Sequence, residues 1–471
     1  MPISGDRVQD KANGANSGSL EVEDDLYGLD PEFVRSVEEA LAEGRTDAAR
    51  ELTEPLHYSD AADLLERLDA EDRAKLVEVL RADFEPEILT ELDEGVRDEV
   101  IEALGFADLA TAIAELDSDD AVWLVSQLDE DERARVMEAL PSETRAIVAQ
   151  GLSYPEYSAG RMMQRELVAV PAYWTVGETI DYLRAAHSVP DEFYDLYVVD
   201  PRHRPIGKIG LARLVRGRRP QRLREIMDDE SLTVPVAADR EEVAFLFRQQ
   251  DLVSAPVVDG AGRLVGVITI DDVVDVIDEE AADDMLRLAG VPDTDLYRAV
   301  KDTVRSRIPW LLVNMCTALV ASSVIGLFEH TLEQIVALAV LMPIVAGLGG
   351  NAGTQTLAVA VRGLATKELD FDNALQVIRK EVLVGMINGV VIACLIGPVA
   401  WAWFGQPTIG IVIGAALVFN LFIAGLMGSV IPLTLEKFGI DPAVASSIFL
   451  TMCTDSLGFF AFLGLATMFL L

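Results

Sequence analysis

The sequence of 471 residues has little cysteine, and no long apolar segment occurs near its start. Its three cysteines, Cys316, Cys394 and Cys453, fall in apolar stretches and form no CxxC pair, which indicates neither a disulfide framework nor a zinc site. Residues 1–24 are rich in Gly, Ser, Asp and Asn, which predicts a disordered tail and no signal peptide. We therefore expect the soluble part to stay in the cytoplasm.

Basic residues are also scarce: 38 Lys and Arg stand against 78 Asp and Glu, a formal net charge of −40. From Lys301 onward there are ten acids and eight bases, so the first 300 residues carry nearly all of this charge. A nucleic acid partner is excluded, because phosphate binding needs a basic surface. Two interpretations of the acids stay open. One is a halophilic adaptation, which the excess of Arg over Lys favours, and the other is binding of divalent cations.

Residues 25–155 form a repeat in which leucine recurs every twelve residues. Acid-rich turns such as Asp69-Ala-Glu-Asp follow several of these leucines and are typical of helix starts. One long amphipathic helix is the alternative, but a period of twelve disagrees with heptads. We expect an all-α, superhelical N-terminal domain of stacked short helices. The leucines are Leu56, Leu68, Leu80, Leu92, Leu104, Leu116, Leu128, Leu140 and Leu152.

Residues 156–277 change to short β-branched strands that alternate with helices, in two copies at about 156–218 and 219–277. The second copy contains Ala255-Pro-Val-Val-Asp-Gly-Ala-Gly-Arg-Leu-Val-Gly-Val-Ile-Thr, followed by Ile270-Asp-Asp. This stretch resembles a CBS domain, and the two copies together resemble a tandem CBS pair. The resemblance implies an α/β fold for this region.

The same resemblance implies a nucleotide site in the second copy. Thr269 and Asp272 match the residues that often hold the ribose of an adenine nucleotide such as ATP, because a hydroxyl and a carboxylate satisfy two sugar hydroxyls. The first copy departs from this pattern, with Gly210 and Arg213 at the equivalent places. At most one nucleotide site is therefore expected per pair. A CBS pair that dimerises without a ligand stays open as the alternative.

Residues 278–308 are predicted to form an acidic helix that connects the CBS pair to the membrane. Like charges at helical spacing destabilise a helix by about 0.2–0.5 kcal/mol per pair, so cations are expected against it. High salt would screen the charges and weaken this inference.

Residues 309–471 contain five apolar stretches, each long enough to span a bilayer: 309–328, 332–361, 378–404, 408–432 and 442–470. All Lys and Arg that flank these stretches fall on one side if the spans alternate, which places that side in the cytoplasm and the C-terminus outside the cell. We expect a multi-pass plasma membrane protein with an all-α domain of five transmembrane helices.

Asp455 is a carboxylate in the middle of the last span, which contains no Lys or Arg. A charge near a bilayer centre costs roughly 2.5–3.5 kcal/mol, so such a residue usually faces a cavity, a partner or an ion path. Thr451 lies four residues earlier and, on a helix, on much the same face. The alternative is that Asp455 is protonated or only hydrogen-bonds a neighbouring helix.

The second span contains Gly349-Gly-Asn-Ala-Gly-Thr-Gln-Thr, which predicts a helix break that lines a cavity. Close packing through small residues is the alternative, but it explains the glycines and not Asn351 and Gln355. Asn314, Asn388 and Asn420 add polar groups on other spans, so several spans are expected to share one wet path.

The order of these parts, with GGNAGTQ in the second span and DPA followed by TD in the fifth, resembles the MgtE family of magnesium channels along nearly the whole chain. The resemblance implies a homodimer that takes up Mg²⁺ through a pore. It implies that a hydrated Mg²⁺ is held near Asp455, the backbone carbonyl of Thr451, and Asn351. Ser447 occupies a position where some members carry Asn.

The resemblance also implies a gate, in which Mg²⁺ binds acidic cytoplasmic interfaces and holds the pore shut. The matching acids here are Asp251, Asp272, Asp275, Glu280, Asp283 and Asp284, with Glu241 as a further candidate. The alternative function is an ion-coupled secondary transporter of divalent cations such as Mg²⁺ or Co²⁺. An enzyme is not expected, since we find no nucleophile and base pair and no phosphate loop.

Overall fold

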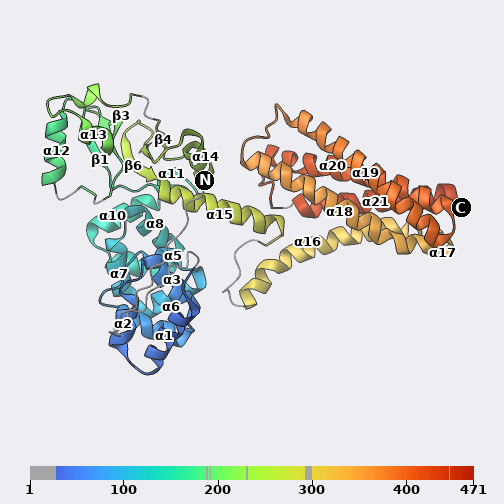
Figure 1. Cartoon of the computed structure of the whole chain (residues 1–471), viewed down its shortest axis with the longest axis horizontal. Helices are drawn as coiled ribbons and strands as arrows, with labels where there is room; N and C mark the ends of the chain where they lie inside the picture. The colour runs from blue at the N-terminus through green and yellow to red at the C-terminus, as the bar shows by residue number, and fades with distance from the viewer. Residues whose placement is uncertain (1–27, 187–188, 191, 230–231, 292–299, 445) are drawn as a thin grey trace, which may run out of the picture. The chain divides into compact units, whose positions relative to one another are not determined.

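The computed structural model describes residues 28–186, 189–190, 192–229, 232–291, 300–444 and 446–471. The chain divides into two compact units, Met1–Glu115 and Leu116–Leu471 (Figure 1). The predicted tail of residues 1–24 lies outside the described residues, as does part of the predicted connecting helix, residues 292–299.

The repeat region folds into short helices, as predicted, and not into one long helix. Helices α1 to α7 belong to the first unit and α8 to α10 to the second. Their bounds are α1 (Pro31–Ala42), α2 (Thr46–Thr53), α3 (Tyr58–Arg67), α4 (Ala70–Leu80), α5 (Ile88–Glu91), α6 (Glu94–Leu104), α7 (Phe106–Glu115), α8 (Ser118–Gln127), α9 (Glu130–Ala139) and α10 (Ser142–Gly151).

The repeating leucines mark the ends of these helices. Leu68, Leu92 and Leu128 are the C-cap residues of α3, α5 and α8; each is extended, with ψ of 139–150°, and almost fully buried. The acid that follows begins the next helix: the Asp69 carboxylate accepts a hydrogen bond from a backbone N–H of α4, and Asp129 completes a capping box on α9. At Leu68 and Leu128, one buried leucine therefore ends a helix and the next residue caps the following helix.

Two small sheets follow, with the same topology in each copy. The first has the order β1 (Val168–Pro171), β2 (Asp195–Val199) and β3 (Pro205–Gly210), and the second has β4 (Val234–Pro235), β5 (Ser254–Val258) and β6 (Leu264–Thr269). In each, the first pair is parallel and the second antiparallel, with a bulge at the same place in the register. The helical parts are α11 (Ala159–Met162), α12 (Val176–Ala185), α13 (Leu211–Arg216), the 3₁₀ turn η1 (Leu223–Glu225) and α14 (Arg240–Gln250).

A buried polar network joins the two copies. The Tyr197 hydroxyl on β2 lies 2.6 Å from the Ser254 hydroxyl on β5, and the Ser254 hydroxyl donates to Asp195 at 2.9 Å. Lys208 of β3 pairs with the same Asp195 carboxylate at 2.7 Å. Buried polar groups need such partners, so this network fixes how the copies pair.

The acidic helix after the second copy is continuous with that copy. Helix α15 (Ile270–Leu288) starts directly after β6 and runs through the expected boundary at residues 277 and 278. Val273 and Val276 are buried against the second copy, while the acids around Asp278 point to solvent. The exposed acids around Asp278 thus lie on the outer side of a helix that apolar contacts hold.

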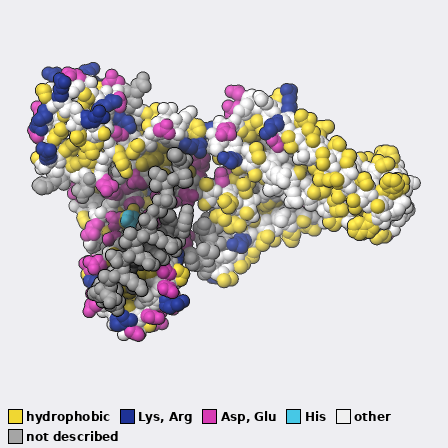
Figure 2. Space-filling view, viewed as in Figure 1, with side chains coloured by type: hydrophobic (Ala, Val, Ile, Leu, Met, Phe, Trp, Pro, Cys, Tyr) yellow, Lys and Arg dark blue, Asp and Glu magenta, His cyan; other side chains and the backbone are white. Residues whose placement is uncertain are grey.

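The rest of the chain forms a bundle of long helices. They are α16 (Val300–Gly326), the short α17 (Glu329–Gln334), α18 (Val336–Ala365), α19 (Ala374–Phe404), α20 (Pro407–Lys437) and α21 (Ser446–Leu470). Within the described residues, five helices are long and apolar enough to cross a membrane. Helix α20 is central and packs against α18, α19 and α21. Hydrophobic side chains cover much of the bundle surface (Figure 2), as expected for a surface in contact with lipid.

Candidate functional site

Helix α21 presents the predicted ion-binding carboxylate. Asp455 is partly exposed and, within the described residues, forms no hydrogen bond or ion pair. Thr451, one turn earlier, is exposed on the same side, and its hydroxyl donates to the half-buried Ser447 carbonyl at 2.9 Å. Thr454 instead faces the bundle, where its hydroxyl donates to Leu450. The open side of α21 is therefore lined by a carboxylate and a hydroxyl.

Helix α18 carries the glycine-rich motif, and the predicted helix break was wrong: the helix is continuous from Val336 to Ala365. Its two sides differ. Asn351, Thr354 and Gln355 are exposed, whereas Gly349 and Gly353 are buried. A Cβ on Gly353 would lie 2.9 Å from Leu450 of α21, so the glycines permit close helix packing. The small residues and the amides of this motif therefore act on opposite sides of one intact helix.

The other predicted polar groups do not share one location. Asn314 and Asn388 are exposed on α16 and α19, whereas Asn420 of α20 is fully buried inside the bundle. The expectation that several spans share one wet path stays a prediction, and within this bundle Asn420 does not face an open side.

Glu381 of α19 is an acid that the sequence analysis missed. It is only 8% exposed, and its carboxylate accepts a long hydrogen bond of 3.4 Å from the Thr356 hydroxyl of α18. Its other oxygen lies 3.3 Å from Lys380. A Cβ on Gly425 would lie 2.6 Å from the Glu381 carbonyl, so α20 also passes close by. Its place beside Lys380 at the end of a span made it look like an ordinary interfacial residue.

Three predicted regulatory acids gather where α14 meets α15. Burial, together with repulsion from Glu280 and Asp284, raises the pKa of Glu241 to about 7. Burial likewise raises the pKa of Asp284 to about 6, with added repulsion from Asp441 and Glu280. Arg240 offsets part of this charge, because its guanidinium lies 2.6 Å from Glu280. The carboxylates retain an excess of negative charge that a proton or a cation can neutralise.

Arg287 connects this cluster to the membrane helices. Its guanidinium lies 2.6 Å from Asp441, in the segment before α21, and 3.3 Å from Asp283 one turn earlier on α15. Asp441 belongs to the DPA motif, and no local pattern predicts its pairing with a residue 154 positions away. The pair ties the end of the acidic helix to the start of the Asp455 helix.

The predicted nucleotide residues form a second acidic location. The Thr269 hydroxyl donates to the Asp272 carboxylate at 2.9 Å. Burial raises the pKa of Asp272 to about 7, and Asp271 and Asp120 contribute repulsion. Asp119 of α8 is 7% exposed, and burial together with Asp272 raises its pKa well above the usual range. Asp119 and Asp120 were missed, because both look like helix-start acids of the repeat.

The remaining predicted acids stand apart. Asp275 lies at the surface with its carboxyl group partly covered. This partial burial and repulsion from Asp271 and Asp278 raise its pKa. Asp251 caps the C-terminus of α14 in the left-handed region, with φ of 51°, and is exposed. Across the described ranges, no group of three or more His, Cys, Asp or Glu side chains is placed to hold a metal ion.

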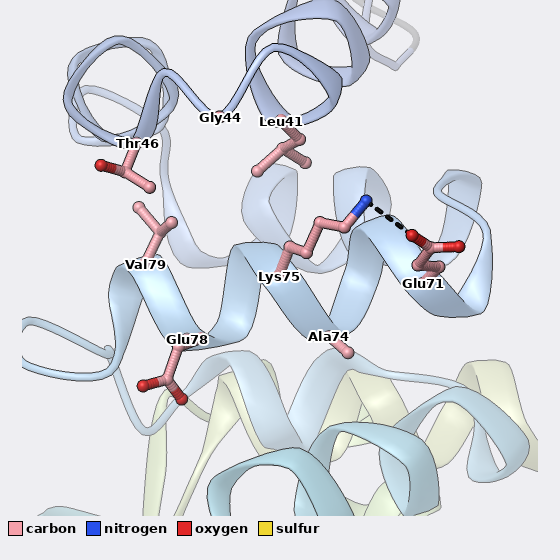
Figure 3. Close-up of a pocket in the computed structure, with 8 residues that line it drawn as sticks. All are labelled: Leu41, Gly44, Thr46, Glu71, Ala74, Lys75, Glu78 and Val79. Atoms are coloured by element: carbon pink, nitrogen blue, oxygen red, sulfur yellow. Dashed lines mark ion pairs between the residues drawn. The ribbon is translucent and has the colours of Figure 1, made fainter.

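A shallow pocket in the first unit is unrelated to these residues. Helices α1 and α4 and the turn before α2 line it, with Leu41 and Val79 facing its interior (Figure 3). Lys75 lies at its edge and pairs with Glu71 at 3.0 Å. None of the predicted site residues contributes to it.

Three family models match successive parts of the chain. A family model described as the MgtE intracellular N domain matches residues 56–157, a CBS domain model matches residues 223–279, and a model described as a divalent cation transporter matches residues 342–465.

Relatives with known names are similar over about two thirds of the chain. The magnesium transporter MgtE of Thermus thermophilus is 37% identical over 321 residues, which cover 67% of this chain and 71% of that protein. The magnesium transporter MgtE of Bacillus subtilis is 33% identical over 324 residues, which cover 68% and 71%.

A solved structure covers the cytoplasmic part. The crystal structure of the cytosolic domain of the Mg²⁺ channel MgtE in complex with ATP is 35% identical, with a TM-score of 0.49, and covers 52% of this chain and 99% of that one. The family models and the two relatives carry the assignment, because the intracellular domain, CBS domain and transporter models match in that order. This protein is a membrane protein with a cytoplasmic N-terminal part, and it belongs to the MgtE family of magnesium transporters.

Proposed function

We propose that this magnesium transporter is a Mg²⁺-selective channel that mediates uptake and closes when internal Mg²⁺ is abundant. The observation that carries the proposal is the Asp455 carboxylate, which lies on the open side of α21 without a partner among the described residues. An unpaired acid within a membrane span is expensive unless an ion or water faces it. Thr451 and Asn351 add oxygen groups on open helix faces.

The chemistry of the open faces suits a hydrated ion. Mg²⁺ prefers octahedral oxygen at about 2.0–2.1 Å and releases water reluctantly. Carboxylate, hydroxyl and amide oxygens can select it by hydrogen-bonding its water shell. Two copies of Asp455 facing each other in a homodimer would double the negative field, which supports a dimeric pore with Ser447 near its inner end. The excess of Lys and Arg on one side of the spans supports a C-terminus outside the cell.

The proposed gate uses the acids of α14 and α15. Glu280 repels Glu241 and Asp284, and this repulsion adds to the burial that raises the pKa of each of these two acids. A bound cation relieves this repulsion and favours the state in which the surfaces are close. Arg287 pairs with Asp283 and Asp441 at the end of this cluster, so the arginine and Mg²⁺ compete for the same carboxylates next to α21. Asp251, Asp275 and Asp283 are assigned to the same gate on the family match alone.

A nucleotide at the second CBS copy forms a separate part of the proposal. Thr269 and Asp272 offer one hydroxyl and one carboxylate to ribose hydroxyls, which fits ATP. Asp119 beside Asp272 is unfavourable for an anionic ligand unless a cation accompanies it. Mg-ATP is therefore expected to bind better than free ATP, which isothermal titration of the purified protein measures.

The test of the pore is a flux assay in liposomes. Asp455→Asn and Asp455→Ala should abolish Mg²⁺ uptake while the protein stays folded, because the carboxylate supplies the field for the ion. Asp372→Asn, which removes an exposed acid between α18 and α19, is the matched control and should conduct normally. Normal uptake by Asp455→Asn would refute the pore assignment. Uptake that requires an opposing Na⁺ or H⁺ gradient would make the protein an ion-coupled transporter, with Glu381 as a second titratable residue.

The test of the gate varies the Mg²⁺ concentration on the cytoplasmic side. Neutralising Asp275, Glu280, Asp283 and Asp284 together should leave the channel conducting at high internal Mg²⁺. The control is a variant in which four exposed acids of the repeat, Glu39, Glu51, Glu54 and Glu102, become Gln. Unchanged inhibition in the first variant would assign its acids to salt adaptation.

A further inference from the structure

Asn420 is a fully buried amide in the middle of α20. Its Nδ2 donates to the backbone carbonyl of Val345 on α18 at 2.8 Å. Its Oδ1 is buried and has no partner within the described residues. A buried polar group with an unmet acceptor is unfavourable in an apolar bundle, so packing alone would favour a leucine here.

Two glycines enclose this side chain. A Cβ on Gly349 of α18 would lie 2.8 Å from the Asn420 Cγ, and a Cβ on Gly458 of α21 would lie at the same distance. Neither position has room for a methyl group, so Asn420 rests against the bare backbone of two helices. Small residues allow such close approach in membrane bundles, and interhelical hydrogen bonds then fix the geometry.

Those two helices carry the residues of the proposed path. Gly349 lies two residues before Asn351, and Gly458 lies three residues after Asp455. We propose that Asn420 is a positioning residue that sets the spacing and rotation of α18 against α21, and thereby the separation of Asn351 from Asp455. The proposal rests on the proposed function, because it assigns a consequence for ion selection to the geometry of that path.

The size and the polarity of Asn420 have separate roles. Its volume keeps α18 and α21 apart by one side chain, and its bond to the Val345 carbonyl fixes the rotation of α18. Asn420→Leu keeps the number of side-chain heavy atoms and the branch at Cγ, and it removes the hydrogen bond. Asn420→Ala removes both and leaves space beside the two glycines.

The experiment enlarges each glycine, shortens Asn420, and measures the effect on ion selectivity. Mg²⁺ and Co²⁺ fluxes into liposomes are measured per folded transporter for Gly349→Ala, Gly458→Ala and Asn420→Ala, and for each glycine variant combined with Asn420→Ala. Each single variant should lower Mg²⁺ flux about tenfold and change the Mg²⁺ to Co²⁺ flux ratio. The double variants should recover at least threefold over the glycine single variants, because the vacated space admits the new methyl group. Gly464→Ala is the control on α21, since a Cβ there would make an ordinary contact of 3.8 Å with Phe328.

A purely structural role gives a different pattern. It lowers the amount of folded transporter and leaves the flux ratio per folded transporter unchanged, and this result would overturn the proposal. Asn420→Leu, measured per folded transporter, should also change the ratio. A wild-type ratio in both Asn420→Leu and Asn420→Ala would overturn the proposal.

Asp455→Asn is measured in parallel to separate the two claims. Loss of flux in Asp455→Asn beside wild-type behaviour of the Asn420 variants would overturn the positioning role alone. Normal flux in Asp455→Asn would overturn the path and the positioning role together.

Discussion

Arg287→Gln gives the sharpest test of how the acidic helix communicates with the membrane domain. The guanidinium contacts Asp441 at 2.6 Å and Asp283 at 3.3 Å. It also opposes the repulsion that raises the pKa of Asp284. Removing it leaves these carboxylates with a bound cation as their remaining neutralising partner. We therefore expect the variant to bind regulatory Mg²⁺ more tightly and to close at lower internal Mg²⁺.

The size of the effect follows from the exposure of the pair. The Arg287 and Asp441 side chains are 33% and 32% exposed, between a surface pair and a buried one. Exposed pairs contribute about 0.2–1 kcal/mol, and breaking buried ones costs about 3–5 kcal/mol. A value of about 1–2 kcal/mol for this pair corresponds to a roughly 5- to 30-fold change in binding. The internal Mg²⁺ concentration for half-inhibition should fall by that factor.

The assay is Mg²⁺ flux into liposomes with internal Mg²⁺ varied, at low and at high KCl. Screening should shrink the difference from wild type at high KCl. Arg263→Gln is the matched control, because it removes an exposed pair with Asp259 at 2.7 Å and lies outside the cluster. An unchanged or raised half-inhibition concentration in Arg287→Gln would show that the arginine closes the gate itself and does not compete with Mg²⁺.

Two further predictions concern titration and Glu381. Without Mg²⁺, the melting temperature should fall as pH rises from about 5 to 8. The folded protein holds protons on Glu241, Asp272 and Asp284 that the unfolded chain releases at lower pH. A melting temperature that does not change with pH in chelator, or that falls equally in excess Mg²⁺, would contradict this. Glu381→Gln should keep Mg²⁺ flux within about threefold of wild type, since the amide oxygen still accepts the hydrogen bond from Thr356. Glu381→Ala removes the acceptor of that hydroxyl and should lose about 1–3 kcal/mol of stability, measured by thermal unfolding. Loss of flux in a stably folded Glu381→Gln would show that ionisation of Glu381 is needed for transport.

The repeat was predictable because its signals are local. A leucine that ends one helix and an acid that caps the next are neighbours in sequence, as Leu68 and Asp69 show. The duplicated sheets and the five spans also depend on short-range patterns, which are strand alternation in one case and long apolar runs in the other. These features therefore appear in the sequence before any tertiary contact is known.

The site depends on contacts that no local pattern contains. Glycines next to amides suggested a broken helix, yet Gly349 serves close packing and Asn351 lies on the open side of the same helix. The role of Asn420 depends on two glycines that reach it from other helices. The pair between Arg287 and Asp441 depends on where α15 ends relative to the segment before α21. Each of these contacts joins residues on different helices or segments. The spacing of residues along one helix does not specify how separate helices pack.

The acids of the soluble part also differ in a way that the sequence does not show, namely in their burial. By sequence, Asp119 and Glu39 are both helix acids of a repeat with a large negative charge. In the fold, Asp119 is buried against Asp272, whereas Glu39 is exposed to solvent. Salt screens the repulsion between exposed acids. A buried acid beside another acid keeps its repulsion, because salt ions do not enter between the two carboxyl groups. Regulation by Mg²⁺ can therefore reside in a few enclosed carboxylates and persist in concentrated salt, while the many exposed ones serve solubility.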